Sequence, residues 1–360
     1  MKYLLLFALT IFLVSCSTNT EQSADTDSEL ALAVHFEKTA FSKASAKAKK
    51  EDKLMLMDVY ATWCVPCKEL DKAVFSDEEI GQFINNKFVS LKVDGEKGEG
   101  PELMKRFGVP GYPTIILFDQ NGEEIDRLVG FDGNKDEYFQ TLQNYLEGKN
   151  TLKDYLSRIE TESDNVELNY EMATKFLYRE EEDRALKYYQ RVVDLDPSDE
   201  YGHRDEAQYQ ISSIRMRIND DPQSLQEFIK NSTNESNLRR AYSSLARYYR
   251  NHKDFEKLIA THEECIARYP ENAAMMNGYA WDIFRLKLTD HYDRGIAVAK
   301  KALQLEPDAA AIWDTLGQLQ FEAGNVAEAI EAMQKAADLD PEMESFKENL
   351  ERYKKSLMQT

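Results

Sequence analysis

The sequence predicts an α/β domain with a central mixed sheet flanked by helices, followed by an all-α solenoid of paired helices. The chain has 360 residues, more than one domain usually holds. Up to about residue 149, short apolar strands alternate with helices, as in a sheet covered by helices. Beyond residue 150 the strand signals stop, and helix-ending prolines recur at spacings typical of helical repeats.

The balance of charge narrows the classes of partner. The chain holds 65 Asp and Glu residues against 45 Lys and Arg residues, a formal net charge of −20. A protein that binds nucleic acid needs basic surfaces to neutralise phosphate, so this composition argues against a nucleic-acid partner. It predicts instead an acidic surface in contact with water.

Residues 1–15 have the pattern of a secretory signal. Lys2 is followed by an apolar run at 4–14, which would rise roughly 16 Å as a helix and is too short to span a bilayer. The run ends in Leu-Val-Ser-Cys at 13–16, which resembles the lipoprotein box of bacteria. That resemblance implies cleavage before Cys16 and a lipid on its thiol, which would hold the protein on a membrane. An ordinary signal peptide beside a chance cysteine is the alternative.

Residues 16–29 are expected to be a disordered tether, because they are mostly polar and show no apolar periodicity. The residue after the lipidated cysteine also bears on location. An Asp there favours the inner membrane in proteobacterial lipoproteins, whereas this chain has Ser17. We therefore expect a lipid-anchored protein of the bacterial cell envelope that faces the periplasm, with the outer membrane slightly favoured.

The first domain is predicted to extend from residue 30 to residue 149. Helices are expected at 40–50, 68–75, 77–86, 101–107 and 134–147, and strands at 54–60, 88–94, 115–119 and 124–130. Ser76 is the expected cap of the third helix, and Pro101 suits the first turn of the fourth. Asn121-Gly122 predicts a tight hairpin between the last two strands.

The strongest chemical signal is Trp-Cys-Val-Pro-Cys-Lys at 63–68, directly after the strand 54–60. A helix that begins at Cys64 offers free N–H groups and a positive dipole end, which favour a thiolate. Cys64 should therefore be the more exposed and reactive sulfur, with Cys67 one turn further in. Pro66 falls in the first helical turn, where its missing N–H costs nothing.

The chain has four cysteines, so the possible roles of this pair are few. With Cys16 assigned to lipid and Cys265 left alone, Cys64 and Cys67 form the one available pair, and its role is catalytic or metal-binding. Structural zinc requires four ligands, and the five histidines show no ligand spacing with the pair. We therefore expect neither a metal nor a cofactor.

The first domain resembles the thioredoxins over about 120 residues. The matching residues are Asp58, Ala61, Trp63, Cys64, Pro66, Cys67 and Lys68, with Gly111, Pro113 and Thr114 further along. The link at 74–77 is similar to that of the periplasmic C-terminal domain of DsbD and its relatives. The order fits as well, since the cysteines follow one strand and the proline precedes a later one.

The resemblance implies a role for each matching residue. Cys64 would attack a substrate disulfide and Cys67 would resolve the mixed disulfide. Asp58 would be buried behind the pair and exchange a proton with Cys67, a role that a raised pKa suits. Pro113 would be cis and pack against the disulfide. Trp63, Pro66 and Tyr112 would support the site, with Trp63 shielding the sulfurs.

One departure concerns the lysine that commonly pairs with the buried Asp in thioredoxins. Ser90 is the best match to its position, and Lys92 lies two residues further on the same strand face. The environment of Asp58 is therefore expected to differ from that of the family.

Residues 150–360 are predicted to form the helical solenoid. Pro197, Pro270, Pro307 and Pro341 end helices, and the last two intervals are 37 and 34 residues. The final unit resembles the tetratricopeptide repeat through Trp313, Leu316, Gly317, Ala329, Ala336 and Pro341. We expect five helix pairs, a divergent one after Pro197, about three extra residues near 287–292, and Cys265 as a buried small side chain. The concave face of such a solenoid usually binds a peptide or another protein.

Together these patterns favour a membrane-tethered periplasmic thiol–disulfide oxidoreductase, in the reducing direction. Its substrates would be protein disulfides, an upstream thiol donor would supply electrons, and the repeats would bind a protein or peptide. Two alternatives stay open. The chain could be an interaction scaffold with a thioredoxin-fold docking domain, since fold alone does not prove activity, or it could be a disulfide isomerase.

Overall fold

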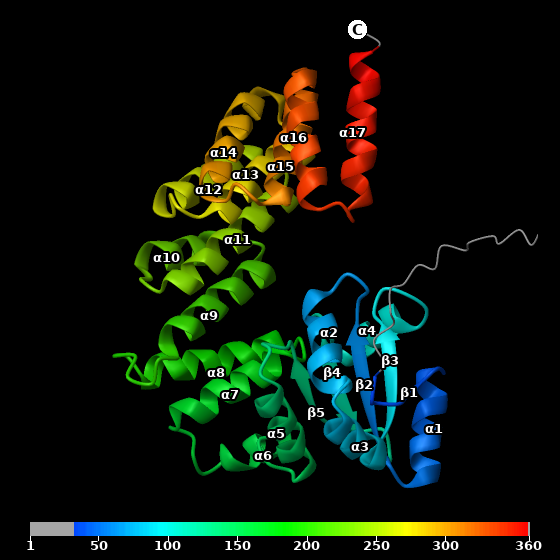
Figure 1. Ribbon diagram of the computed structural model, residues 1–360. Coiled ribbons are helices and arrows are strands. Elements are labelled where there is room, and N and C mark those ends of the chain that lie inside the picture. Colours follow the sequence, from blue (N-terminus) through cyan, green and yellow to red (C-terminus); the bar gives the residue numbers. More distant parts are fainter. Residues whose placement is uncertain (1–31, 359–360) are drawn as a thin grey trace, which may run out of the picture. The chain divides into compact units, whose positions relative to one another are not determined.

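The computed structural model describes residues 32–358, which divide into two compact units at Thr151 and Leu152 (Figure 1). The predicted signal at 1–15, the lipidated Cys16 and the tether at 16–29 lie outside the described residues. No helix among the described residues has the length and apolar character needed to cross a membrane.

A five-stranded sheet with the order β1-β3-β2-β4-β5 forms the centre of the first unit. Its strands are β1 (Phe36–Glu37), β2 (Leu54–Tyr60), β3 (Phe88–Asp94), β4 (Thr114–Phe118) and β5 (Glu124–Val129). The first three are parallel to one another, and β4 is antiparallel to β2 and to β5, so the predicted mixed sheet is confirmed. The sequence did not predict β1, because two residues are too few to show a pattern.

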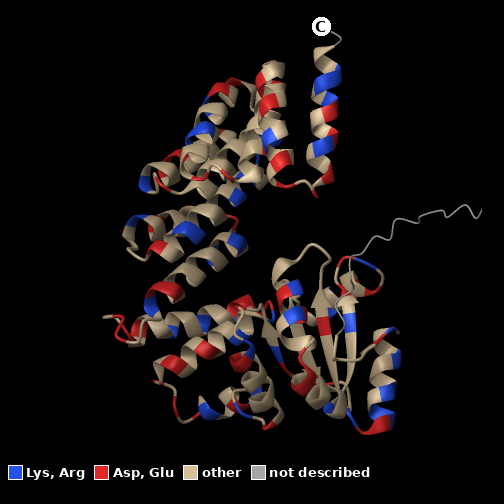
Figure 2. Cartoon of the chain, viewed as in Figure 1, with Lys and Arg blue, Asp and Glu red and all other residues tan. Residues whose placement is uncertain are grey.

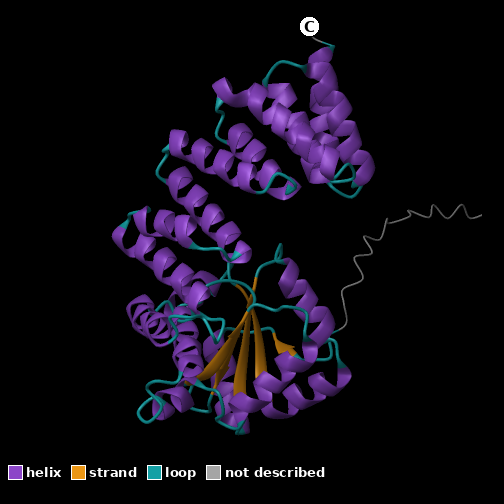
Figure 3. Ribbon diagram, turned by 90° about the vertical axis from the view of Figure 1, so that its left-hand side faces the viewer, coloured by secondary structure: helices purple, strands orange, loops and turns teal. Residues whose placement is uncertain are grey.

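Helices cover both faces of this sheet (Figure 3). They are α1 (Phe41–Glu51), α2 (Val65–Leu70), α3 (Glu78–Lys87), α4 (Gly100–Phe107) and α5 (Lys135–Leu146), and a π-helical turn at Asp71–Phe75 extends α2. Alternate residues of β2 point to opposite faces: Met55 and Met57 pack with α1 and α4, and Leu56 packs with α2, α3 and α5. By the same alternation, Asp58 lies on the same face of the sheet as Leu56, the face that α2 covers.

The start of α3 differs from the prediction. Asp77, and not Ser76, caps this helix, because its Oδ1 accepts from the N–H groups of Glu79 and Ile80, each at 3.0 Å. Ser76 instead ends the preceding π-helical turn, and its hydroxyl donates to the carbonyl of Asp71 at 2.8 Å. Two helical segments meet within two residues here, and both Ser and Asp are residue types that cap helices well.

The second unit consists of helices within the described residues, and five consecutive pairs are present as predicted. The pairs are α7 (Val166–Leu177) with α8 (Glu182–Leu195), α9 (Arg204–Asn219) with α10 (Gln223–Asn231), α11 (Glu235–Asn251) with α12 (Phe255–Arg268), α13 (Ala273–Arg285) with α14 (Tyr292–Leu305), and α15 (Ala310–Glu322) with α16 (Val326–Leu339). Helix α6 (Leu152–Arg158) precedes them and α17 (Glu344–Leu357) packs on α16. A short 3-10 helix at Thr289–His291 accounts for the extra residues between α13 and α14.

Small side chains let the paired helices approach. A Cβ at Gly317 would lie only 3.3 Å from the carbonyl oxygen of Ala329 on the partner helix, which is tighter than most Cβ contacts in proteins. Cys265 is buried with a free thiol, as predicted, and burial raises the pKa of that thiol to about 11. Such a thiol is a packing group rather than a nucleophile at neutral pH.

Candidate active site

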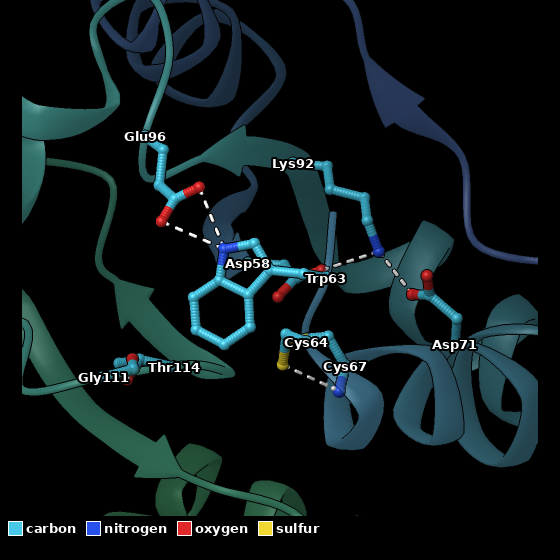
Figure 4. Close-up of a disulfide and its surroundings, with 9 residues drawn as sticks. All are labelled: Asp58, Trp63, Cys64, Cys67, Asp71, Lys92, Glu96, Gly111 and Thr114. Atoms are coloured by element: carbon cyan, nitrogen blue, oxygen red, sulfur yellow. Dashed lines mark hydrogen bonds and ion pairs between the residues drawn. A yellow bond between two sulfur atoms is a disulfide. The ribbon is translucent and has the colours of Figure 1, made fainter. Parts of the chain in front are cut away.

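Cys64 and Cys67 are joined by a disulfide at the point where β2 ends and α2 begins (Figure 4). Cys64 is the N-cap of α2, and its Sγ accepts a hydrogen bond from the N–H of Cys67 at 3.1 Å. Pro66 occupies the first turn, as expected. The free N–H groups of this turn would stabilise a thiolate on Cys64 once the disulfide is reduced.

The predicted difference in exposure between the two sulfurs is wrong for this oxidised state. Cys64 and Cys67 each expose 3% of their surface, and Tyr60 and Tyr112 pack against the cluster that the cysteines form with Ala61. Burial therefore does not distinguish the cysteines. The hydrogen bond from Cys67 to the sulfur of Cys64 does, because it favours negative charge on Cys64.

Trp63 covers the disulfide less than predicted. Its side chain is 63% exposed and lies edge-on to Tyr112, with the ring centroids 5.9 Å apart. Its indole N–H donates to the carboxylate of Glu96, at 3.0 Å to Oε2 (Figure 4). Neither Tyr60 nor Glu96 was predicted to lie at the disulfide site. Glu96 could not be expected there, because the loop after β3 brings it to Trp63 from 33 residues away.

The peptide bond between Tyr112 and Pro113 is cis, as the resemblance to thioredoxins implied. Pro113 is buried, and its carbonyl accepts from the N–H of Gly130 at 2.8 Å. The hydroxyl of Thr114 donates to the carbonyl of Gly111 at 2.8 Å. The contact of Pro113 with the disulfide stays a prediction, whereas Tyr112 lies against the cysteines.

Asp58 is buried on β2, with 1% of its surface exposed. The ammonium of Lys92 lies 2.9 Å from its Oδ2, and Oδ1 has no hydrogen-bond partner among the described residues. Burial raises the pKa of Asp58 to about 6, although the charge and the hydrogen bond of Lys92 oppose that rise. A carboxyl group with this pKa can accept or release a proton near neutral pH.

Lys92, and not Ser90, is the cross-strand neighbour of Asp58. The parallel register of β2 and β3 places Lys92 beside Asp58 and Ser90 beside Leu56. Ser90 is buried, and its hydroxyl has no hydrogen-bond partner in the described part of the chain. The lysine that pairs with the buried carboxylate therefore stands two residues beyond Ser90, the position that the resemblance to thioredoxins indicated.

Lys92 also pairs with Asp71, a residue that we did not predict (Figure 4). Asp71 follows Cys67 by four residues, one helical turn, and that spacing was a signal available in the sequence. The rings of Phe36, Tyr60 and Phe75 surround the ammonium at 5.0–5.4 Å from their centroids. Two carboxylates and three aromatic faces thus hold one cation that is only 18% exposed.

Replacing Lys92 with Gln is expected to raise the pKa of Asp58 by about one unit or more, because the cation that lowers it is removed. The measurement is the NMR titration of the Asp58 carboxyl carbon. Lys97→Gln is the matched control, since Lys97 is exposed and pairs with Asp94 rather than with Asp58. An unchanged pKa in Lys92→Gln would show that burial alone sets the titration of Asp58.

Two family models match separate parts of the chain. The model of the thioredoxin-like domain matches residues 41–146, and that of the tetratricopeptide repeat matches residues 285–344.

Within the described residues, no group of three or more His, Cys, Asp or Glu side chains is placed to hold a metal ion.

Curated relatives match the first domain. The thiol:disulfide interchange protein DsbD of Yersinia pestis (strain Pestoides F) is 39% identical over 100 residues, which cover 27% of this chain and 17% of DsbD. DsbD of Haemophilus ducreyi is 42% identical over 85 residues, which cover 22% of this chain and 15% of DsbD. This chain therefore spans a small part of the length of these relatives.

Among solved structures, a candidate disulphide-isomerase from Bacteroides thetaiotaomicron is 41% identical and covers 32% of this chain and 96% of its own, with a TM-score of 0.30. The family matches agree with the sheet, the disulfide and the paired helices described above. The chain thus carries a thioredoxin-like domain of the thiol–disulfide oxidoreductase type, followed by tetratricopeptide repeats.

Proposed function

We propose that this protein is a thiol–disulfide oxidoreductase that reduces protein disulfides in the bacterial envelope. The observation that carries the proposal is the Cys64–Cys67 disulfide at a helix start, in a domain that also buries a carboxyl group with a pKa of about 6. Buried titratable groups with such pKa values are common where proton transfer accompanies chemistry.

In the first step the thiolate of Cys64 attacks one sulfur of a substrate disulfide. A bond forms between Cys64 Sγ and that sulfur, and the other substrate sulfur leaves as a thiolate that takes a proton from water. The N–H of Cys67, which contacts Cys64 Sγ in the oxidised state, would stabilise the attacking thiolate.

In the second step Cys67 resolves the mixed disulfide. Its thiol loses a proton, its sulfur attacks Cys64 Sγ, and the second substrate thiolate leaves. The enzyme ends with the Cys64–Cys67 bond, so two electrons have passed to the substrate. Asp58 would accept the proton of Cys67. Its side chain lies on the face of the sheet that α2 covers, and its carboxyl group is mostly ionised at pH 7. An upstream dithiol donor would then reduce the enzyme again.

We place this activity on a membrane surface and give the repeats a recruiting role. The Leu-Val-Ser-Cys run at 13–16 supports a lipid on Cys16, the polar residues after it support a tether, and Ser17 slightly favours the outer membrane. Five helix pairs form a surface of the kind that binds peptides and proteins. The repeats would bring a substrate or a partner protein to the disulfide.

Insulin reduction tests the redox proposal. With dithiothreitol as donor, the protein should accelerate insulin precipitation, and Cys64→Ser/Cys67→Ser should react at the rate of dithiothreitol alone. Cys265→Ser is the control, because that thiol is buried and outside the motif, and it should keep the activity. Equal rates for the wild type and the double variant would favour the scaffold. Rescue of scrambled disulfides without net reduction would favour an isomerase.

A further inference from the structure

A groove of about 800 Å³ on the second unit is rich in arginine. Helices α9, α11, α12 and α13 line it, and its arginines are Arg239, Arg240, Arg247, Arg250 and Arg285. Asp282 is the one carboxylate among the lining residues. In a chain with a net charge of −20, five arginines around one carboxylate form a local positive field. We call this feature the arginine groove.

Helical spacing explains how the groove is built. Arg239, Ser243 and Arg247 are four residues apart on α11 and therefore share one face of that helix. On α13 the same spacing joins Ala274, Gly278 and Asp282. Small side chains thus leave the centre of the groove open, and arginines stand around it.

Asp282 does not neutralise the whole field. It accepts from Arg250 at 2.6 Å and from His262 at 2.9 Å, and although burial opposes ionisation, these two contacts hold its pKa below the usual range. Arg240 is likewise occupied, because it pairs with Glu206 at 2.6 Å. Two sets of contacts thus lie within the protein: Asp282 with Arg250 and His262, and Arg240 with Glu206.

Of the three other arginines, Arg239 lies one turn after Glu235 on α11 and interacts with its charge, so Arg247 and Arg285 remain available. Both are exposed, and neither makes a hydrogen bond or an ion pair with any of the residues 32–358. Arginine presents a planar fork of donors that matches a carboxylate in two parallel hydrogen bonds. Two such forks face one groove, from α11 and from α13, and a ligand with at least two carboxylates would engage both.

Gly278 shows that the groove is open rather than a packing site. A Cβ placed there would meet no atom within 4 Å, whereas at Gly317, on the equivalent helix of the next pair, it would meet Met333 Cε at 3.2 Å. Met275 and Trp281 add partly buried apolar surface beside this gap. The groove therefore offers both charge and apolar contact to an extended chain.

The lining residues of the other described pockets on this unit carry a net charge between −1 and +1. The pocket against α17 is lined by three glutamates and three basic residues, namely Glu344, Glu348, Glu351, Lys347, Arg352 and Lys355. Figure 2 shows both signs of charge spread over the helices of the repeats. An excess of arginine is thus a property of this groove and not of the repeat surface in general.

We propose that the arginine groove binds an acidic segment of a partner protein, with Arg247 and Arg285 pairing with its carboxylates. A short peptide rich in Glu or Asp fits the exposed forks, the open floor at Gly278 and the apolar contact. The inference rests on the recruiting role proposed above and specifies the chemistry of the partner.

Fluorescence anisotropy with a labelled Glu/Ala peptide, and with its Gln/Ala counterpart, tests the proposal on the whole chain. We expect the Glu/Ala peptide to bind and to weaken as salt is added, and the neutral peptide to bind at least about tenfold more weakly. Arg247→Gln/Arg285→Gln should weaken binding by about tenfold or more, since it removes both forks. Lys300→Gln/Lys301→Gln is the control; it removes the same charge from exposed residues of α14 and should retain binding.

Gly278→Leu tests the same site by filling the groove without changing its charge. A Cβ at this position meets no atom within 4 Å, and leucine suits a helix better than glycine, so the fold should hold while the groove is filled. Binding should fall although every charge is kept.

The proposal is overturned if the acidic peptide does not bind at low salt, or if binding survives both groove variants. Tighter binding of a single-stranded DNA oligonucleotide than of the acidic peptide would also overturn it. The insulin assay separates this result from the redox proposal. Cys64→Ser/Cys67→Ser should bind the peptide normally, and the groove variants should reduce insulin normally.

Discussion

A Cys67→Ser variant is expected to accumulate covalent adducts with substrate proteins through Cys64. Without the resolving sulfur the reaction stops at the mixed disulfide, because serine cannot attack Cys64 Sγ. Repeated turnover of insulin should fall by about two orders of magnitude or more, since the two cysteines act as a unit. Non-reducing gels of cell extracts would show the adducts, and mass spectrometry would identify the trapped proteins.

Two controls make this experiment decisive. Cys64→Ser should trap nothing, because Cys64 is the N-cap of α2 and receives the hydrogen bond of the Cys67 N–H that favours a thiolate, whereas Cys67 lies within the helix. Cys265→Ser, introduced into the Cys67→Ser chain, should leave the adducts unchanged, since Cys265 is buried in the second unit. Equal trapping by the two single variants would contradict the assignment of Cys64 as nucleophile, and no trapping would contradict the mechanism.

Asp58→Asn is expected to stabilise the oxidised first unit at pH 8 and to slow its chemistry. The pKa of Asp58 is about 6 in the folded protein against an ordinary value of 3.8, so the folded state binds this proton more tightly than the unfolded state. The free energy of unfolding therefore falls as the pH rises from about 4 to 6, and it stays low above that. Asparagine carries no charge to bury, so about 2–3 kcal/mol should be regained at pH 8. Loss of the pair with Lys92 would reduce this gain.

Urea unfolding of the variant and the wild type at pH 4 and pH 8 measures the effect. Trp63 can report on the first unit alone if Trp281 and Trp313 are replaced with Phe in both chains. The stability difference should be present at pH 8 and nearly vanish at pH 4, where Asp58 is protonated. A variant that is less stable at pH 8 would show that Lys92 fully compensates the buried charge.

The same substitution should slow the second chemical step. The asparagine side chain of the variant cannot accept the proton of Cys67, so the release of substrate thiol at pH 7 should become about tenfold to hundredfold slower. Stopped-flow fluorescence of Trp63 would follow this step, and the attack by Cys64 should be little affected. An unchanged rate would assign the proton transfer to water instead.

Local patterns predicted most of the fold. The strands Leu54–Tyr60 and Phe88–Asp94 were predicted with these bounds, because apolar runs of this length between polar segments have few other solutions. The proline spacing predicted five helix pairs and about three extra residues near 287–292, where the structure has a 3-10 helix at Thr289–His291. The cap of α3 was misassigned because Ser76 and Asp77 are both good caps, and backbone direction decides between them.

Long-range neighbours explain what the sequence did not predict. Asp58 and Lys92 meet through the register of β2 and β3, which places residues 34 positions apart side by side. Glu96 reaches Trp63 through a loop. The arginines of α11 have the spacing of an ordinary solvated helix face, and only the packing of α13 beside them forms a groove. These features depend on the tertiary arrangement and leave no local pattern.

The setting of Lys92 has a further consequence for the proton at Asp58. A lysine on an open surface would turn towards water once its carboxylate took up a proton. Lys92 also contacts Asp71 and the rings of Phe36, Tyr60 and Phe75, and none of these contacts involves the Asp58 proton, so we expect them to persist in both forms of Asp58. The counter-ion is therefore preorganised, and little reorganisation energy is spent when the carboxyl changes charge. Asp58 can thus gain or lose its proton while the positive charge beside it stays in place.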